Sequence, residues 1–416
     1  MIITFQLMID RIRRLSRFES PTKQDWGIYF IAFIILQIPA IINFYQNNGL
    51  NNGYTLFAES LLHGQLSLPK MDYYGDMVHY GNNYYLPYPP LPSIILLPFV
   101  AIFGASQVNT VAIATLISCV NLYLLYKILV RLLIPQSYFN WLLLAFIFGT
   151  GYWFALFTSH HVYAFAHIIS ILFQFLLINE LLGKKRWWLA GIFIGCTFLT
   201  RQFTIFYAVF ALIYMLYTNQ ENRLKLQWRK VIELLAPIGF FIVIYMAYNY
   251  ERFGNVFDTG YDHIIFIGVL KERVDQFGVF NVRYFLFNLY SVLIKGFNID
   301  FEGKTYLNIK DMDLWGTSLL AASPFLVASF KAQWPKYLKA GAWITVLIIL
   351  TGQLFYHNNG LEQVNTSRFT LDFLPLLFVL TSVGAVSIPR WLFKGMVVYA
   401  VLLNIISFAI HFMYQS

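Results

Sequence analysis

Long apolar runs, separated by short polar stretches, dominate the chain from residue 27 onwards. Runs such as IYFIAFIILQIPAIINF and GMVVYAVLLNIISFAIHF approach or exceed the ~18–20 apolar residues that a helix needs to cross a bilayer. Their number predicts about eleven membrane spans. The expected spans are 27–45, 107–130, 139–158, 162–182, 187–200, 202–217, 231–249, 313–330, 340–355, 370–388 and 393–413.

Two polar segments interrupt this pattern and are rich in charged and aromatic residues. They predict long outer loops at 46–106 and 250–312. In the first loop, YTLFAESLLHG has its apolar residues on one helical face, which fits a helix in the membrane interface or one packed on the bundle. The stretch LPSIILLPFVAIFG is short and broken by prolines, so we expect an interfacial or re-entrant helix there.

Charge gives the topology. Charged residues make up only 12% of the chain, against about 25% in a soluble domain. With a cytoplasmic N-terminus, 19 of the 29 basic residues fall in inner loops and 14 of the 20 acids fall outside. The positive-inside rule therefore places the N-terminus in the cytoplasm, and the net charge of +9 reflects topology and not nucleic-acid binding. The acidic outer face suits a carboxylate-based site.

These patterns predict an all-α, polytopic membrane protein. A basic cytoplasmic segment, 1–26, precedes a single integral membrane domain, 27–416. We expect it in a bacterial plasma membrane, with its site on the outer face. Two cysteines, both inside predicted spans, imply no disulfide framework.

Several segments carry a resemblance when taken in order. They read AESLLHGQLSLP, DMVHYGNNYYLPYPPLP, GIFIGCTFLTRQFTIFY, NYERFGNVFDTGY and NTSRFTLDFLPLLFVL. Their order and placement resemble the GT-C glycosyltransferases, in particular bacterial proteins similar to dolichyl- or polyprenyl-phosphate-mannose mannosyltransferases. The resemblance implies a GT-C-like bundle of about eleven transmembrane helices. It also implies transfer of a sugar from a polyprenyl-phosphate donor to a glycan, lipid or protein acceptor on the outer side.

Such a transfer needs a carboxylate base, because the acceptor hydroxyl has a high pKa. We favour Asp76, with Asp72 second, since both stand in the first outer loop. Direct attack by the hydroxyl would invert the anomeric centre. The family usually also carries an acid soon after the first span, but this chain reads YQNNGLNNGY there. An altered site, or an inactive relative that acts in envelope assembly, is therefore an alternative.

The leaving phosphate needs fixed cations, for which we favour Arg201 and Arg368. Arg201 sits between two short spans, where an unpaired guanidinium would be costly. The alternatives are contact with lipid headgroups or pairing with a nearby acid; for Arg368 that acid would be Asp372, four residues on. If the assignments hold, Asp76, Arg201 and Arg368 should line one cavity that opens to lipid.

Other residues are candidates for contacts around the donor. His160 and His161 could hydrogen-bond a phosphate or sugar, while Glu59, Tyr84, Tyr85 and Arg252 belong to the loops expected around the substrate. The tyrosines of the first loop could instead form an interfacial aromatic belt, and Arg252 could simply hold its loop.

Three histidines, His160, His161 and His167, fall within eight residues, but no acidic ligand is adjacent. No metal site is predicted, although a divalent cation is left open because some GT-C enzymes need one. A transporter or lipid flippase is the alternative from another class. No internal repeat is visible, and charge in mid-span is nearly absent, which counts against a carrier.

Overall fold

The computed structural model describes residue 38 and residues 52–69, 77–218, 227–313, 315–360 and 365–414. Apart from Ile38, these residues all belong to one compact unit, 39–416. The predicted segment 1–26, the first span 27–45 apart from Ile38, and both favoured acids, Asp72 and Asp76, lie outside the described residues.

The described part of the chain is built mainly from apolar helices. Five of them are long and apolar enough to cross a membrane, and at 1.5 Å per residue they approach or exceed the ~30 Å hydrocarbon thickness. The prediction of a helical membrane protein is therefore confirmed. The five are α5 (Thr110–Arg131), α8 (Val162–Leu182), α11 (Trp228–Phe253), α15 (Lys336–Leu354) and α17 (Arg390–Tyr414).

Shorter elements complete the bundle. The short α-helices are α3 (Gly53–Leu62), α4 (Leu91–Phe103), α6 (Phe139–Phe148), α7 (Tyr152–Phe157), α9 (Trp187–Phe198), α10 (Tyr207–Thr218), α12 (Gly268–Phe277), α13 (Tyr284–Leu289), α14 (Leu319–Ala322) and α16 (Leu374–Ala385). The 3₁₀ helices are η1 (Ala105–Gln107), η2 (Gln136–Tyr138), η3 (Gln202–Phe206), η5 (Tyr261–His263), η7 (Pro324–Lys331) and η8 (Arg368–Asp372), while η6 (Tyr290–Ile294) is a π-helical turn.

Two predicted spans are broken in the structure. The span expected at 139–158 divides into α6 and α7 at Gly149, where a side chain would collide with the carbonyl of Ala145 and with Phe325. The span expected at 313–330 is the four-residue α14 followed by the 3₁₀ helix η7. The break falls at Ser323, whose hydroxyl donates to the Gly149 carbonyl at 2.6 Å, and at a proline that cannot continue an α-helical ladder.

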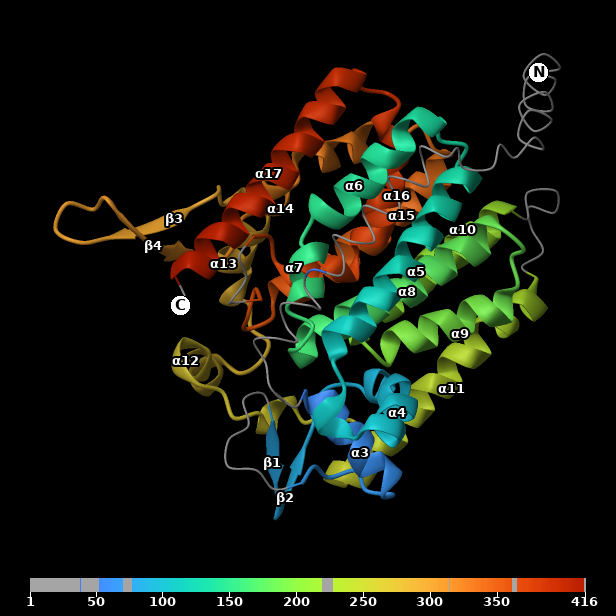
Figure 1. The fold of residues 1–416 in the computed structure, drawn as a ribbon. Helices are drawn as coiled ribbons and strands as arrows, with labels where there is room; N and C mark the ends of the chain where they lie inside the picture. Colours follow the sequence, from blue (N-terminus) through green and yellow to red (C-terminus); the bar gives the residue numbers. More distant parts are fainter. Residues whose placement is uncertain are drawn as a thin grey trace. The chain divides into compact units, whose positions relative to one another are not determined.

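Helices pack both on their neighbours in the chain and on helices that are distant in sequence (Figure 1). Helix α5 packs on α8, α8 on α9, α9 on α11, and α10 on α15. Gly191 and Gly195 let α9 and α11 approach closely, because a Cβ at either position would collide with α11. Glycines four residues apart are typical of close helix contacts in membranes.

The first outer loop gathers at one end of the bundle. There, α3 and α4 lie near a hairpin of β1 (Val78–Tyr80) and β2 (Asn83–Tyr85), as Figure 1 shows. Helix α3 is buried along most of its length and packs on α4. Of the two interpretations of this segment, the structure therefore has the helix packed on the bundle.

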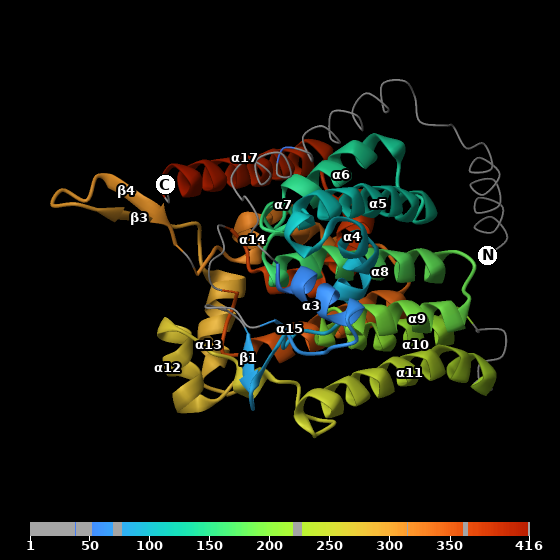
Figure 2. The same ribbon diagram turned by 60° about the horizontal axis from the view of Figure 1, so that its bottom comes forward.

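The second outer segment carries η5, α12, α13, η6 and a second hairpin, β3 (Ile299–Glu302) with β4 (Asn308–Met312). This hairpin extends away from the helices in both views (Figure 2). Neither hairpin was predicted. They add two small antiparallel sheets to the helical fold.

Candidate active site

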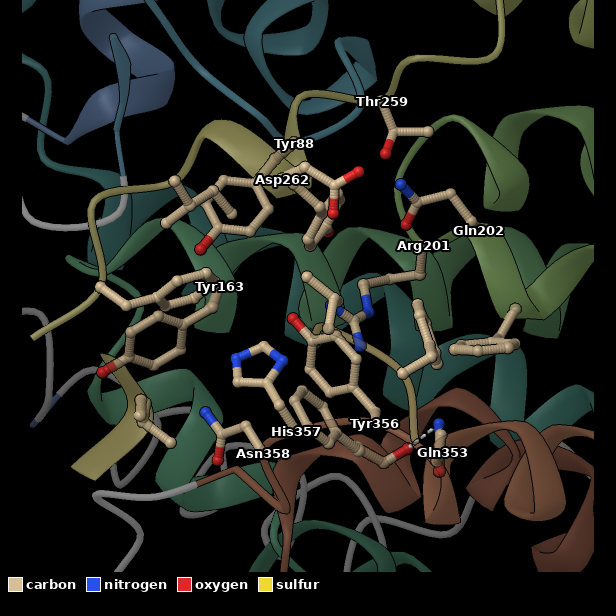
Figure 3. A pocket seen from close by; sticks show the side chains of 18 of the residues that line it. Tyr88, Tyr163, Arg201, Gln202, Thr259, Asp262, Gln353, Tyr356, His357 and Asn358 are labelled. Atoms are coloured by element: carbon tan, nitrogen blue, oxygen red, sulfur yellow. Dashed lines mark hydrogen bonds between the residues drawn. The ribbon is translucent and has the colours of Figure 1, made fainter. Parts of the chain in front are cut away.

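A cavity of about 380 Å³ opens where the two outer segments meet the bundle (Figure 3). Its volume lies within the range of small-molecule sites. Aromatic and polar side chains from several distant parts of the chain form its wall. Those with a bearing on its chemistry are Tyr88, Tyr163, Arg201, Asp262, Tyr356, His357 and Arg368.

Arg201 and Arg368, the two predicted phosphate ligands, both line this cavity. They come from segments 167 positions apart, just before η3 and at the start of η8. The sequence placed them at the same membrane face, and the fold brings them to the same wall.

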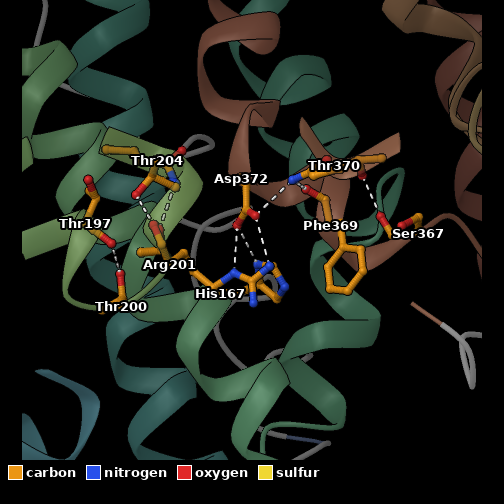
Figure 4. A network of polar contacts seen from close by, with 12 residues as sticks. His167, Thr197, Thr200, Arg201, Thr204, Ser367, Phe369, Thr370 and Asp372 are labelled. Atoms are coloured by element: carbon orange, nitrogen blue, oxygen red, sulfur yellow. Dashed lines mark hydrogen bonds and ion pairs between the residues drawn. The ribbon is translucent and has the colours of Figure 1, made fainter. Parts of the chain in front are cut away.

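Arg201 is held by an internal anion (Figure 4). Its Nε and Nη2 donate to the two carboxylate oxygens of Asp372, each at 3.0 Å. Asp372 is fully buried, and the Arg201 side chain is 13% exposed. Pairing with an acid, one of the two alternatives to a phosphate contact, is therefore found for Arg201. Its Nη1 is the nitrogen not engaged with Asp372.

Further polar groups converge on the same carboxylate. Gln353 Nε2 donates to Asp372 Oδ2 at 3.0 Å, and His167 Nδ1 lies 3.1 Å from Oδ1. Asp372 thus joins side chains from α8, α15 and the turn before η3. A buried ion pair with several hydrogen bonds restricts the conformations of both side chains, and so it fixes the position of the Arg201 guanidinium.

The backbone around Arg201 is also fixed. Its N–H donates to the Thr197 carbonyl at 2.8 Å, and its carbonyl accepts the Thr204 hydroxyl at 2.6 Å (Figure 4). These bonds terminate α9 and begin η3. The guanidinium is therefore presented from a rigid turn between two helices.

Arg368 has a different environment. Its guanidinium lies over the Tyr163 ring, with Cζ 3.9 Å from the ring centroid, and Nη1 donates to the Gly360 carbonyl at 3.2 Å. The sequence offered an ion pair between Arg368 and Asp372, but the Asp372 carboxylate pairs with Arg201. The reason is local: η8 is a 3₁₀ helix, in which residues four apart point about 120° away from each other.

The remaining predicted residues fall outside the cavity lining. His161 stacks on Tyr163 with ring centroids 5.1 Å apart, and burial lowers the pKa of His160. Glu59 is half-buried on α3. Tyr84 and Tyr85 lie on β2, where Tyr85 packs on Phe253.

Arg252 holds the junction between the two outer segments. It is 3% exposed, donates Nη1 to the Leu86 carbonyl at 2.7 Å, and donates Nη2 to Asn249 at 2.8 Å. Its guanidinium also stacks on Tyr248 at 3.7 Å. These contacts fit the loop-holding interpretation of Arg252.

The lining residues that were not singled out from the sequence include Asp262, His357 and Tyr356. His357 is 1% exposed, and its Nδ1 has no hydrogen-bond partner among the described residues. Burial, together with the Arg273 charge, lowers the pKa of His357 to about 4, so the ring is neutral near pH 7. Asp262 carried one available signal: it directly follows the NYERFGNVFDTGY segment, which is part of the family resemblance.

Within the described residues, no group of three or more His, Cys, Asp or Glu is placed to hold a metal ion. His167 instead faces Asp372, while His160 and His161 stand apart from it at the turn before α8.

Known proteins resemble this chain in sequence and in fold. Residues 88–246 match the family model described as dolichyl-phosphate-mannose-protein mannosyltransferase. The crystal structure of ArnT from Cupriavidus metallidurans bound to undecaprenyl phosphate is similar at a TM-score of 0.51 and 12% identity. The match covers 90% of this chain and 62% of that chain. The apo structure of the same ArnT matches with a TM-score of 0.46, the same identity and the same coverage. The comparison with curated protein sequences gives no match.

The class of protein follows from the fold. This is a multi-pass helical membrane protein with the fold of ArnT, that is, a GT-C fold. The predicted resemblance to dolichyl-phosphate-mannose mannosyltransferases is confirmed in sequence over residues 88–246, and the fold of ArnT extends over 90% of the chain. The chain spans about 62% of the length of the ArnT chain that it resembles.

Proposed function

We propose that this protein transfers a sugar from a polyprenyl-phosphate donor to an acceptor hydroxyl at the outer face of the membrane. One observation carries the proposal: two arginines and several tyrosine rings line a single cavity in a GT-C fold. The matched family model is named for a dolichyl-phosphate-mannose-dependent transferase, and the structural neighbour is bound to undecaprenyl phosphate. Both names refer to prenyl phosphates.

The two arginines would make different contributions to binding the phosphate. Asp372 offsets the charge of Arg201. The contribution of Arg201 is therefore mainly a fixed hydrogen-bond donor, Nη1, and less a net positive charge. Arg368 is stacked on an aromatic ring and donates to a neutral carbonyl, and it adds a second guanidinium to this wall. A fixed cation stabilises the leaving phosphate as negative charge gathers on it, without reorganisation.

The rest of the cavity suits a sugar. Tyr88, Tyr163 and Tyr356 each combine an apolar ring with a polar hydroxyl, which matches a sugar's alternation of C–H faces and hydroxyls. His357 offers a buried, neutral ring nitrogen in the same cavity (Figure 3). Aromatic-lined cavities with a few polar groups are typical of small-ligand sites.

The chemistry would be a single displacement. The acceptor oxygen attacks the anomeric carbon, the bond to the phosphate oxygen breaks, and a carboxylate takes the hydroxyl proton, which inverts the anomeric centre. Asp76 and Asp72 remain the first-loop candidates for this base. A catalytically inactive relative would bind the donor and not turn it over.

A reconstituted assay tests the proposal. The protein in liposomes receives undecaprenyl-phosphate mannose and three acceptors: a Ser/Thr peptide, an alkyl glycoside and a bacterial lipid extract. We expect product with the wild type, a loss of about 100-fold or more in Arg368→Gln, since one electrostatic contact is worth roughly 10²–10³ in rate, and partial activity in Arg368→Lys.

Arg283→Gln is the matched control. Arg283 is an exposed arginine of the second outer segment and stacks on Phe277, away from the cavity lining. It should behave as the wild type. Equal turnover in Arg368→Gln and Arg283→Gln would reject the phosphate role of Arg368.

A further inference from the structure

Asp262 is the only carboxylate among the described residues that line the cavity. It stands in η5, and its side chain lies beside Tyr88, across the cavity from His357 and Asn358 (Figure 3). It is solvent-exposed, whereas Arg368 on the same cavity is only 8% exposed. The cavity is therefore cationic at its buried wall and carries an acid where water reaches it.

The loop that carries Asp262 is held in place on both sides. Gly260 has φ +85°, and a Cβ there would lie 2.7 Å from the Phe253 ring, so the close approach and the left-handed conformation both favour glycine. Asp258 Oδ1 accepts the Gly260 N–H at 2.8 Å, and Asp258 Oδ2 lies 2.9 Å from His263 Nε2. The loop is thus closed around η5 by local bonds.

Two acids of this loop consequently have different surroundings. The Asp258 carboxylate accepts the Gly260 N–H and contacts His263, so its role is to hold the loop. Asp262 points to the cavity between these anchors. The loop thus holds the backbone that presents one carboxylate, that of Asp262, to the cavity.

We propose that Asp262 is the general base of the transfer, an inference that rests on the proposed function. The acceptor hydroxyl gives its proton to the Asp262 carboxylate as its oxygen bonds to the anomeric carbon. The bond from that carbon to the phosphate oxygen breaks, and the electron pair stays on the departing polyprenyl phosphate. The products are the glycosylated acceptor, the lipid phosphate and a protonated Asp262, which returns its proton to water.

Inversion requires the base and the leaving group on opposite faces of the sugar. The carboxylate comes from η5, while the two arginines come from the segments at η3 and η8. An exposed base is accessible to an acceptor that arrives from water.

The test compares matched Asp→Asn variants in the liposome assay with undecaprenyl-phosphate mannose. Asp262→Asn should lose about 100-fold or more in kcat, the usual size of a general-base contribution, while its affinity for undecaprenyl phosphate stays that of the wild type. Formate, a small external base, should restore part of the rate only in Asp262→Asn. Asp275→Asn is the control, because Asp275 is an exposed acid on α12 that pairs with Lys271 and does not line the cavity.

The outcomes separate the two proposals. An active wild type with an equally fast Asp262→Asn overturns the role of Asp262 alone. Formate rescue confined to Asp76→Asn or Asp72→Asn would move the base to the first loop and also overturn it. A wild type that transfers mannose to none of the acceptors would remove the proposed function, and this inference with it.

Discussion

The Arg201–Asp372 pair gives the sharpest prediction for stability, and the perturbation is Asp372→Asn. The carboxylate receives two guanidinium bonds and one from Gln353, all at 3.0 Å, and it is fully buried. An amide keeps one oxygen acceptor and turns an NH₂ group toward the donors of Arg201. The arginine then keeps its charge in a buried site without its anion.

The magnitude follows from burial. Removing one partner of a buried ion pair costs about 3–5 kcal/mol. The Arg201 side chain is 13% exposed at the cavity, so we expect the lower end, about 3 kcal/mol. At about 2 °C per kcal/mol, the value for larger domains, the apparent melting temperature should fall by roughly 6 °C.

The assay is thermal unfolding of the purified protein in detergent, with Glu180→Gln as the control. Glu180 also pairs with an arginine, but the Arg186 side chain is 46% exposed, so this change should cost less than about 1 kcal/mol. The double variant with Arg201→Gln removes both charges and should be more stable than Asp372→Asn alone. A double variant that is less stable than either single one, or an Asp372→Asn protein as stable as the wild type, would refute the reasoning.

Three other changes test the fold and its pH response. Gly191→Ala should cost about 1–3 kcal/mol by overpacking against the Leu234 carbonyl, whereas Gly239→Ala, where a Cβ meets open space, should be neutral or stabilising in the same melting assay. Because the folded pKa of His357 is about 4 and the unfolded value is near 6.5, its contribution to stability is present above pH 6.5 and is lost as the pH falls toward 4. Wild type should lose about 2 kcal/mol from this group between pH 7.5 and 5, and His357→Gln should show a correspondingly flatter dependence; parallel curves would contradict this. Arg252→Lys should expose the outer segments to protease, since an ammonium cannot make the planar contacts to Leu86 and Asn249 together; unchanged proteolysis would remove its holding role.

The long helices could be predicted from sequence because their signal is local. A mainly apolar run of 19 residues or more, such as α8 or α15, needs no tertiary information to be recognised. The breaks at Gly149 and Ser323 were missed, because both sites are as apolar around them as a continuous span. Pro324 was a local signal for one break, whereas the hydrogen bond between the Ser323 hydroxyl and the Gly149 carbonyl joins the two breaks across distant parts of the chain.

Some site residues could likewise be identified from sequence, and others could not. Arg201 and Arg368 were identifiable as charged residues at the ends of spans, where each needs a reason to be tolerated. The partner of Asp372 was not identifiable, because Arg201 lies 171 positions away and the i,i+4 rule applies only to an α-helix. Asp262 was passed over for a similar reason, since only the folded loop turns it, and not Asp258, toward the cavity.

The most direct test of the central claim is an experimental structure of the protein with undecaprenyl phosphate bound. The proposed role of the two arginines predicts phosphate oxygens within about 3.2 Å of guanidinium nitrogens of Arg368 and Arg201, the ordinary hydrogen-bond range, with the prenyl chain leaving the cavity toward lipid. A phosphate bound away from both arginines, in a protein that retains the cavity, would contradict it.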